Sequence, residues 1–142
     1  MNREQIAEIY KKYNLAKDDI FTLKFGDIKK PFIRRTGIEK IQAQLGIQIK
    51  YDIQNISNDH KHVVILATGF IFKDMTVVNG VKPKPSVIVS SFGECSPSNN
   101  TSNYPISIAE KRSKARVILQ ISGLYKMGLH SEDESEEFKE KK

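Results

Sequence analysis

Apolar residues at helical spacing predict two short helices in the first third of the chain. In residues 5–13, Ile6, Ile9 and Tyr13 recur every three or four positions, so one face of a helix is apolar and the other is charged. Residues 37–45 repeat this pattern and are followed by glycine, which is typical of the position just after a helix. We therefore expect N-terminal helices that each bury one face.

The stretch between these helices is less regular. Residues 19–33 alternate only loosely between apolar and polar positions, and Gly26 and Pro31 interrupt the alternation. Both residue types are common in turns and rare inside strands. We expect an irregular extended segment here.

The period changes to two in the middle of the chain. Residues 47–54 place isoleucine or tyrosine at every second position, which predicts a half-buried strand. Residues 62–73 are β-branched and aromatic on both faces, and residues 86–94 form a third strand after the turn signal of Asn79 and Gly80. Three consecutive strands with short links predict an antiparallel meander.

Residues 105–123 predict one long helix, which begins with a proline as many helices do. Ile118 and Leu119 belong to its apolar bands, and a stripe of small and basic residues that includes Arg112 and Arg116 lies outside those bands. The predicted fold class is therefore α+β: a three-stranded antiparallel meander packed by a long C-terminal helix, a β-β-β-α core with N-terminal helices before it.

The length of 142 residues is typical of one domain, within which we distinguish three regions. Residues 1–28 hold the N-terminal helix and the extended segment, and residues 29–130 hold the β-β-β-α core. Residues 131–142 are acidic, with too few apolar side chains to offset the entropy lost on ordering. We therefore expect a disordered tail over these last residues.

Charge is distributed unevenly between the tail and the rest of the chain. The tail carries six acids and three lysines, a net charge of −3, whereas the whole chain carries +6, so residues 1–130 carry +9. A basic body with an acidic end is typical of proteins that bind polyanions, and the tail could compete weakly for the same surface. This distribution favours nucleic acid as the partner.

The sequence offers little for catalysis. Cys95 is the only cysteine, so it makes no internal disulfide, and no base is evident beside it. The histidines His60, His62 and His130 have no metal-ligand spacing with other candidate ligands, and no glycine-rich phosphate loop is present. We expect a protein that is not an enzyme and needs neither a cofactor nor a metal.

The chain has no run approaching the about 18 apolar residues of a membrane helix. Its charged N-terminus lacks the apolar region of a signal peptide. These features predict a cytoplasmic or nucleoid-associated protein with no membrane partner.

Two clusters of cations are candidates for contact with DNA. Lys29, Lys30, Arg34 and Arg35 surround Phe32, so this segment can neutralise phosphates and offer a ring to a base. The alternative is that the ring packs in the core and the cations are only solvated.

The second cluster lies on the long helix and consists of Lys111, Arg112, Lys114 and Arg116. Arginine on a packed helix usually pairs with a carboxylate or a phosphate, so both a protein partner such as Glu110 or DNA remain open.

The order of elements and several local features resemble phage and mobile-element single-strand annealing proteins of the Erf/Sak type, which are related to the eukaryotic recombination mediator Rad-fifty-two. The resemblance covers roughly residues 29–134. It is carried by the segment PFIRRTGIEKIQAQLGI, by the Gly93 and Glu94 end of the third strand, by Ala109, Glu110, Lys111 and Arg112 at the start of the helix, and by Arg116, Gly123 and the acidic residues 131–134.

This resemblance implies ATP-independent binding of single-stranded DNA and annealing of complementary strands in homologous recombination or repair. It also implies a homo-oligomer, either a ring or a filament, whose basic groove holds the DNA backbone with the bases outward. By position, Arg34, Arg35, Arg112 and Arg116 belong to that groove. An exonuclease or a single-stranded DNA-binding protein is a possible partner, and a phage-encoded protein would work in the host cytoplasm or nucleoid.

Three other functions remain open. The protein could protect single-stranded DNA without annealing it, or it could be a small metal-dependent nuclease or resolvase, which would need clustered acids. It could also be a structural protein whose basic surface meets an acidic protein partner.

Overall fold

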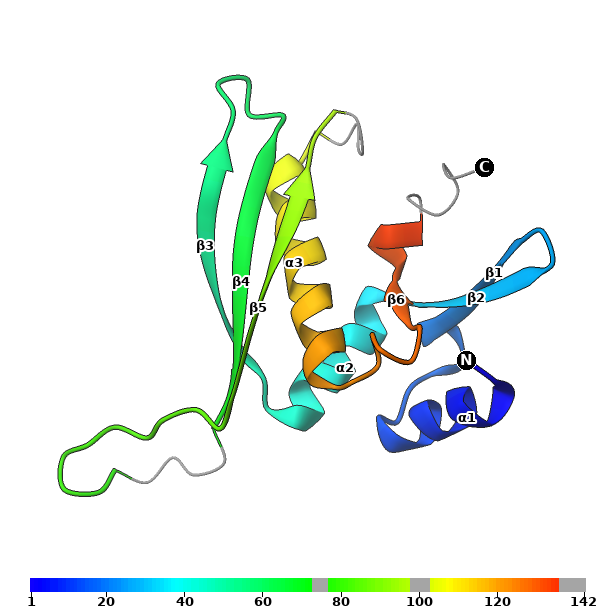
Figure 1. The fold of residues 1–142 in the computed structure, drawn as a ribbon, viewed down its shortest axis with the longest axis horizontal. Helices are drawn as coiled ribbons and strands as arrows, with labels where there is room; N and C mark the ends of the chain where they lie inside the picture. The colour runs from blue at the N-terminus through cyan, green and yellow to red at the C-terminus, as the bar shows by residue number, and fades with distance from the viewer. Residues whose placement is uncertain (73–76, 98–102, 136–142) are drawn as a thin grey trace.

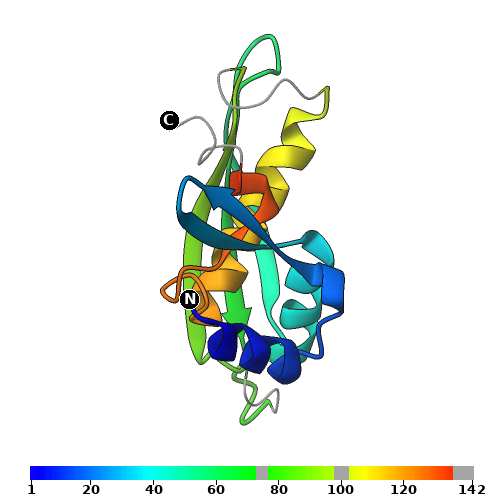
Figure 2. The same cartoon turned by 90° about the vertical axis from the view of Figure 1, so that its right-hand side faces the viewer.

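The computed structural model describes residues 1–72, 77–97 and 103–135. Within these ranges the chain folds into two three-stranded sheets and three α helices. The long helix α3 (Pro105–Ile121) lies between the two sheets, as both views show (Figure 1 and Figure 2).

The larger sheet is the predicted antiparallel meander. Its strands β3 (Gln48–Ile56), β4 (Val63–Ile71) and β5 (Val87–Cys95) pair in the order β3-β4-β5. Helix α3 packs on β4 and β5. The α+β class, the meander and the long C-terminal helix are therefore confirmed.

Two glycines allow α3 to approach the sheet closely. A Cβ atom on Gly93 of β5 would collide with the backbone O of Ala109 and the backbone N of Ser113, and a Cβ on Gly69 of β4 would collide with Val117. The small residues of α3 therefore lie on its packed face. Our prediction that they lie outside the packed bands is wrong, because strand and helix backbones are in contact here.

A second sheet was not predicted. Strands β1 (Ile20–Phe25) and β2 (Ile28–Ile33) form a hairpin, and β6 (His130–Ser131) pairs in parallel with the end of β2. Gly26 adopts the left-handed conformation that a two-residue hairpin turn requires. Pro31 is tolerated because β6 pairs only with the two residues of β2 that follow it. The irregular segment expected here is a regular hairpin, so the fold is more than a β-β-β-α unit.

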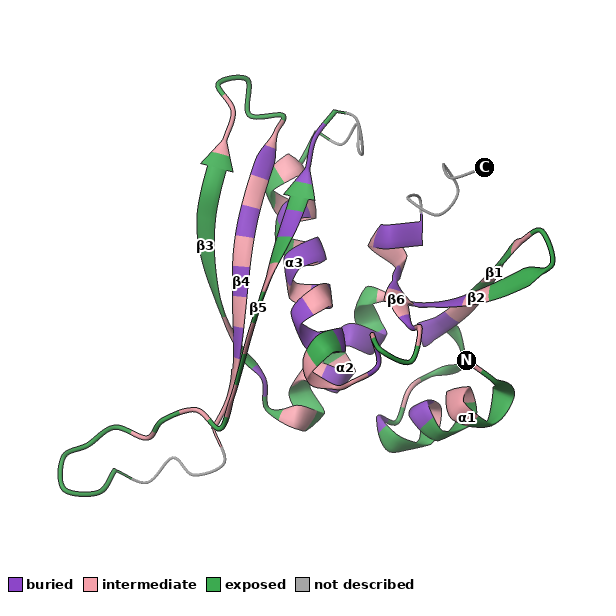
Figure 3. Cartoon of the chain, in the orientation of Figure 1, coloured by how far each residue is buried: buried purple, intermediate pink, exposed green. Residues whose placement is uncertain are grey.

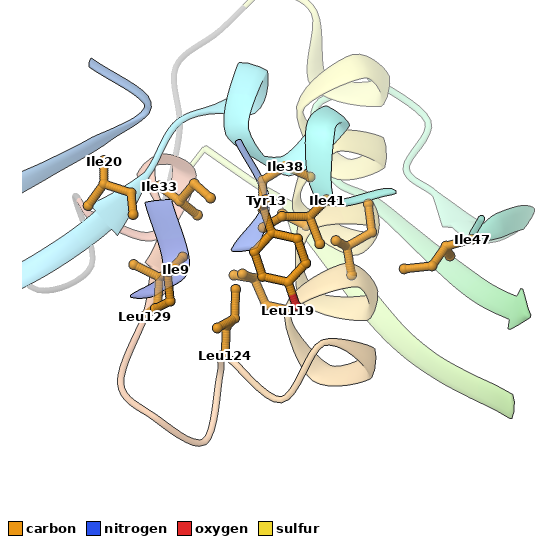
Figure 4. Packing of buried hydrophobic residues seen from close by; sticks show 12 residues of the cluster. Ile9, Tyr13, Ile20, Ile33, Ile38, Ile41, Ile47, Leu119, Leu124 and Leu129 are labelled. Carbon is orange, nitrogen blue, oxygen red and sulfur yellow. The ribbon is translucent and has the colours of Figure 1, made fainter. Parts of the chain in front are cut away.

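The main core lies where three helices meet. The predicted N-terminal helices are confirmed as α1 (Arg3–Lys12) and α2 (Arg35–Leu45). Their apolar faces pack with the C-terminal half of α3 and the segment that follows it (Figure 4). The fully or largely buried side chains are Ile9, Tyr13, Ile20, Ile33, Ile38, Ile41, Ile47, Ala115, Ile118, Leu119, Leu124 and Leu129.

A smaller cluster lies between the meander and the N-terminal half of α3. It contains Val63, Ile65, Cys95 and Ala109. Burial raises the pKa of the Cys95 thiol, which fits a structural cysteine.

Strand β3 is more exposed than predicted. Tyr51 is 36% exposed and Ile53 is 58% exposed, although both lie on the apolar side of the strand. The strand is exposed along most of its length because α3 covers β4 and β5 (Figure 3). The expectation of a half-buried strand is therefore wrong for this edge of the sheet.

The predicted disordered tail begins too early. Residues 131–135 pack against the body through β6 and a short 3-10 helix, η2 (Glu132–Glu134), and Glu134 is only 3% exposed. Tertiary partners for the acids provide the stabilisation that the local composition lacks. Residues 136–142 of the predicted tail lie outside the described residues. No helix in the described ranges is long and apolar enough to cross a membrane.

Candidate nucleic-acid interface

The two arginines of α3 bind groups of the protein itself. The buried Arg112 contradicts its assignment to a DNA groove, whereas the Arg116 side chain is 28% exposed. Arg112 is 3% exposed, and its Nη1 donates to the backbone O of Glu94 at 2.7 Å. Arg116 donates through Nε to Oε1 of Glu134 at 2.6 Å and through Nη1 to the backbone O of Phe92 at 2.8 Å. Because the small-residue face of α3 packs on β5, the neighbouring guanidinium groups reach the carbonyls of that strand.

These contacts also close one edge of the meander. Phe92 and Glu94 belong to β5, which pairs only with β4 in the described sheet. Their carbonyls are acceptors that a further strand would use, and the guanidinium groups of Arg112 and Arg116 hold them.

Four other predicted cations converge, although they come from distant parts of the sequence. Arg34 and Arg35 lie where β2 passes into α2, and Lys111 and Lys114 lie on α3. A cavity of about 180 Å³ is lined by Arg35, Lys111 and Lys114, and a neighbouring one of about 210 Å³ is lined by Arg34, Arg35 and Lys111. We call this group of four cations the basic cleft.

Acidic side chains line the same cavities. They are Glu39, Glu110, Glu132 and Asp133. Glu132 accepts a hydrogen bond at 3.1 Å through Oε1 from the backbone N of Arg35, the first residue of α2. That helix has no side-chain cap of its own, and a helix N-terminus favours negative charge, so Glu132 occupies an anion position.

The pKa of the Asp133 carboxyl is shifted by burial and by the charges around it. Burial raises its pKa, and the nearby carboxylate of Glu132 raises it further, whereas Arg112 and Lys111 lower it. The net direction is upward, because burial of this carboxyl has the largest effect.

Asp19 fixes the start of α2 from the other side. Its buried carboxylate accepts hydrogen bonds from Thr36 Oγ1, from Lys40 Nζ at 2.6 Å and from the backbone N of Ala16 at 2.6 Å, and its own backbone O accepts from Arg34 N at 2.7 Å. Burial alone would raise the pKa of Asp19, but the hydrogen bonds from Lys40 and Thr36 outweigh it and lower the pKa. No pattern in the sequence indicated this role.

The remaining predicted cations lie along the β1–β2 hairpin. Lys29 is exposed and pairs across the hairpin with Lys24, and Lys30 is partly exposed. Phe32, by contrast, is fully buried and stacks on Phe21 at 5.7 Å between ring centroids. The prediction that Phe32 offers a ring to a base is therefore wrong, because the ring belongs to the core under the hairpin.

The part of the chain that the structure describes holds no group of three or more histidine, cysteine, aspartate or glutamate side chains that could bind a metal ion. His62 lies 3.0 Å from Glu94 on the exposed end of the meander.

No family model, no curated protein and no solved structure matches this chain.

Proposed function

We propose that this protein binds single-stranded DNA through its phosphates and anneals complementary strands without ATP. The observation that carries the proposal is the basic cleft. Arg34 and Arg35 meet Lys111 and Lys114 at one place on the surface, although the two pairs lie far apart in the sequence. Acidic side chains line the same cavities, so a phosphate would compete with them for these cations.

The cleft suits a phosphate better than a base. None of the described residues that line its two cavities is aromatic, so the cavities provide no surface on which a base would stack. Contacts to phosphate hold a strand without covering the edges of its bases, which is what pairing with a second strand requires.

The hairpin can extend this contact along the strand. Lys29 and Lys30 lie on β2, which leads directly to Arg34, and at about 3.3 Å per residue the path from Lys29 to Arg34 covers about 16 Å. Adjacent side chains of a strand point to opposite faces, so one of the two lysines can extend the contact on a given side of β2.

Assembly into a homo-oligomer, a ring or a filament, is part of the proposal. One cleft with four cations and several acids binds weakly, and repeated copies multiply weak sites through effective concentration. The helix-free face of the meander supports association, because Ile88 is 59% exposed and Phe92 is 53% exposed there.

The binding test removes charge from the cleft. Lys111→Gln with Lys114→Gln is expected to weaken binding to a labelled oligonucleotide about tenfold, and to reduce the slope of log affinity against log salt by about 0.7 for each phosphate that is no longer neutralised. Lys11→Gln with Lys12→Gln removes the same charge from exposed positions on α1 and serves as the control. If both pairs of substitutions weaken oligonucleotide binding equally, the basic cleft is not the binding site.

The annealing test uses two complementary oligonucleotides without ATP. The protein is expected to accelerate their pairing. If the protein binds the strands but slows their pairing, it protects single-stranded DNA without annealing it. A protein with no salt-dependent affinity for the oligonucleotide would instead have a basic surface that meets an acidic protein.

A further inference from the structure

Strand β3 is an edge that no described element covers. The meander has the order β3-β4-β5, so the outer edge of β3 has no partner strand among the described residues. Both its faces are largely exposed, and β3 lies at the margin of the molecule (Figure 1 and Figure 3). The backbone N–H and C=O groups of such an edge can pair with another strand.

The other edge of the sheet is less available. On β5 the guanidinium groups of Arg112 and Arg116 hold the carbonyls of Glu94 and Phe92. A head-to-tail contact between β3 of one copy and β5 of the next would have to displace both groups. A contact between β3 and β3 of a second copy displaces neither.

The sequence of β3 is complementary to itself in one antiparallel register. Centred on Tyr51, that register places Lys50 opposite Asp52 of the second copy, and Asp52 opposite Lys50. It also places Ile49 opposite Ile53 on the apolar side. All these residues precede the irregularity that follows Ile53 in the pairing with β4.

The neighbouring registers are unfavourable. A register centred on Lys50 places that lysine opposite its own copy, and one centred on Asp52 does the same for the aspartate. Parallel pairing in register places Lys50 beside Lys50 of the second copy and Asp52 beside its Asp52, so like charges repel. Only the register centred on Tyr51 joins opposite charges at both positions and leaves no like charges face to face.

We propose that two copies of this chain associate through β3, antiparallel and centred on Tyr51, to form one continuous six-stranded sheet with two-fold symmetry. The contact also covers Tyr51 and Ile53, which α3 leaves exposed. The inference does not depend on DNA binding. Because a two-fold contact closes after two copies, any larger ring or filament needs a second surface.

A charge swap tests the register on the full chain. Sedimentation equilibrium is expected to show a dimer for the wild type, and either Lys50→Asp or Asp52→Lys is expected to weaken it about tenfold, because each places like charges opposite one another twice. The double variant Lys50→Asp with Asp52→Lys restores opposite charges and is expected to restore the dimer. Both residues are exposed, and thermal unfolding checks that each variant is folded.

Cross-linking gives an independent test of the same register. Residues directly opposite in antiparallel strands have Cα atoms about 4.5 or 5.5 Å apart, which suits a disulfide. Tyr51→Cys is therefore expected to form a covalent dimer on mild oxidation. Asn55→Cys is the control, because eight residues of offset separate its two copies by about 27 Å.

Several outcomes would overturn the proposal. These are a wild-type chain that is monomeric at high micromolar concentration, a dimer that neither single charge change weakens, and a double variant that stays as weak as the single ones. Equal cross-linking of Tyr51→Cys and Asn55→Cys would also overturn it, since random collisions would then explain the disulfide.

Discussion

Replacing Arg116 by methionine should destabilise the fold, because the guanidinium compensates a buried carboxylate. Arg116 Nε lies 2.6 Å from Glu134 Oε1, and the Glu134 side chain is 4% exposed. Removing one partner of a buried pair costs about 3–5 kcal/mol, since the other charge stays buried. The Arg116 side chain is 28% exposed, so water can reach the site, and we expect a loss of about 3 kcal/mol, at the low end of that range.

Urea unfolding followed by circular dichroism measures this loss. Arg35→Met is the matched control, because Arg35 and Glu39 form an exposed pair at 3.9 Å whose removal costs about 0.5 kcal/mol. The double variant Arg116→Met with Glu134→Met removes both buried charges and should be more stable than Arg116→Met alone. If Arg116→Met keeps wild-type stability and instead loses affinity for single-stranded DNA, the structural role is refuted and the groove assignment regains support.

Four further outcomes follow from the structure. Gly93→Ala should lower the free energy of unfolding by about 3 kcal/mol in urea titrations, because its Cβ meets the backbone of α3; unchanged stability would contradict that contact. The stability that Asp19 contributes is present above about pH 4 and is lost as the pH falls through its lowered folded pKa, so the difference between wild type and Asp19→Asn in urea unfolding should shrink below pH 4. Glu132→Gln should raise oligonucleotide affinity about fivefold, equivalent to about 1 kcal/mol, by removing the carboxylate from the anion position of α2. Glu8→Gln, an equal charge change on exposed α1, should have a smaller effect, and equal effects would indicate net charge alone. Cys95, which is 1% exposed with a raised pKa, should react with a thiol reagent much more slowly in the folded protein than in urea, and fast labelling of the folded chain would contradict its burial.

The candidate site was predicted only in part. Arg34, Arg35, Lys111 and Lys114 were named from their clustering in the sequence, and the structure places them around adjoining cavities. Clustering did not separate them from Arg112, because a charge pattern does not show which face of a helix meets a strand.

The acidic residues near the C-terminus show the same limit. Composition predicted a disordered tail from residue 131 onward, yet Glu134 is buried against Arg116 and Glu132 caps α2. The stabilising partners lie far from these acids in the sequence, so no local property of the segment contains them. The hairpin of β1 and β2 was missed for a different reason. Its signals are local, namely the alternation of apolar and polar residues and the turn at Gly26, but Pro31 interrupts the alternation.

The sequence by itself determined the helices and the meander, because periods of 3.6 and 2.0 follow from backbone geometry over a few neighbouring residues. Only the tertiary structure decided which side of α3 meets β5 and that β3 remains an open edge. It also decided that two arginines serve the fold while four other cations line a cleft. Each of these outcomes depends on contacts between segments far apart in the chain, and a local pattern carries no information about them.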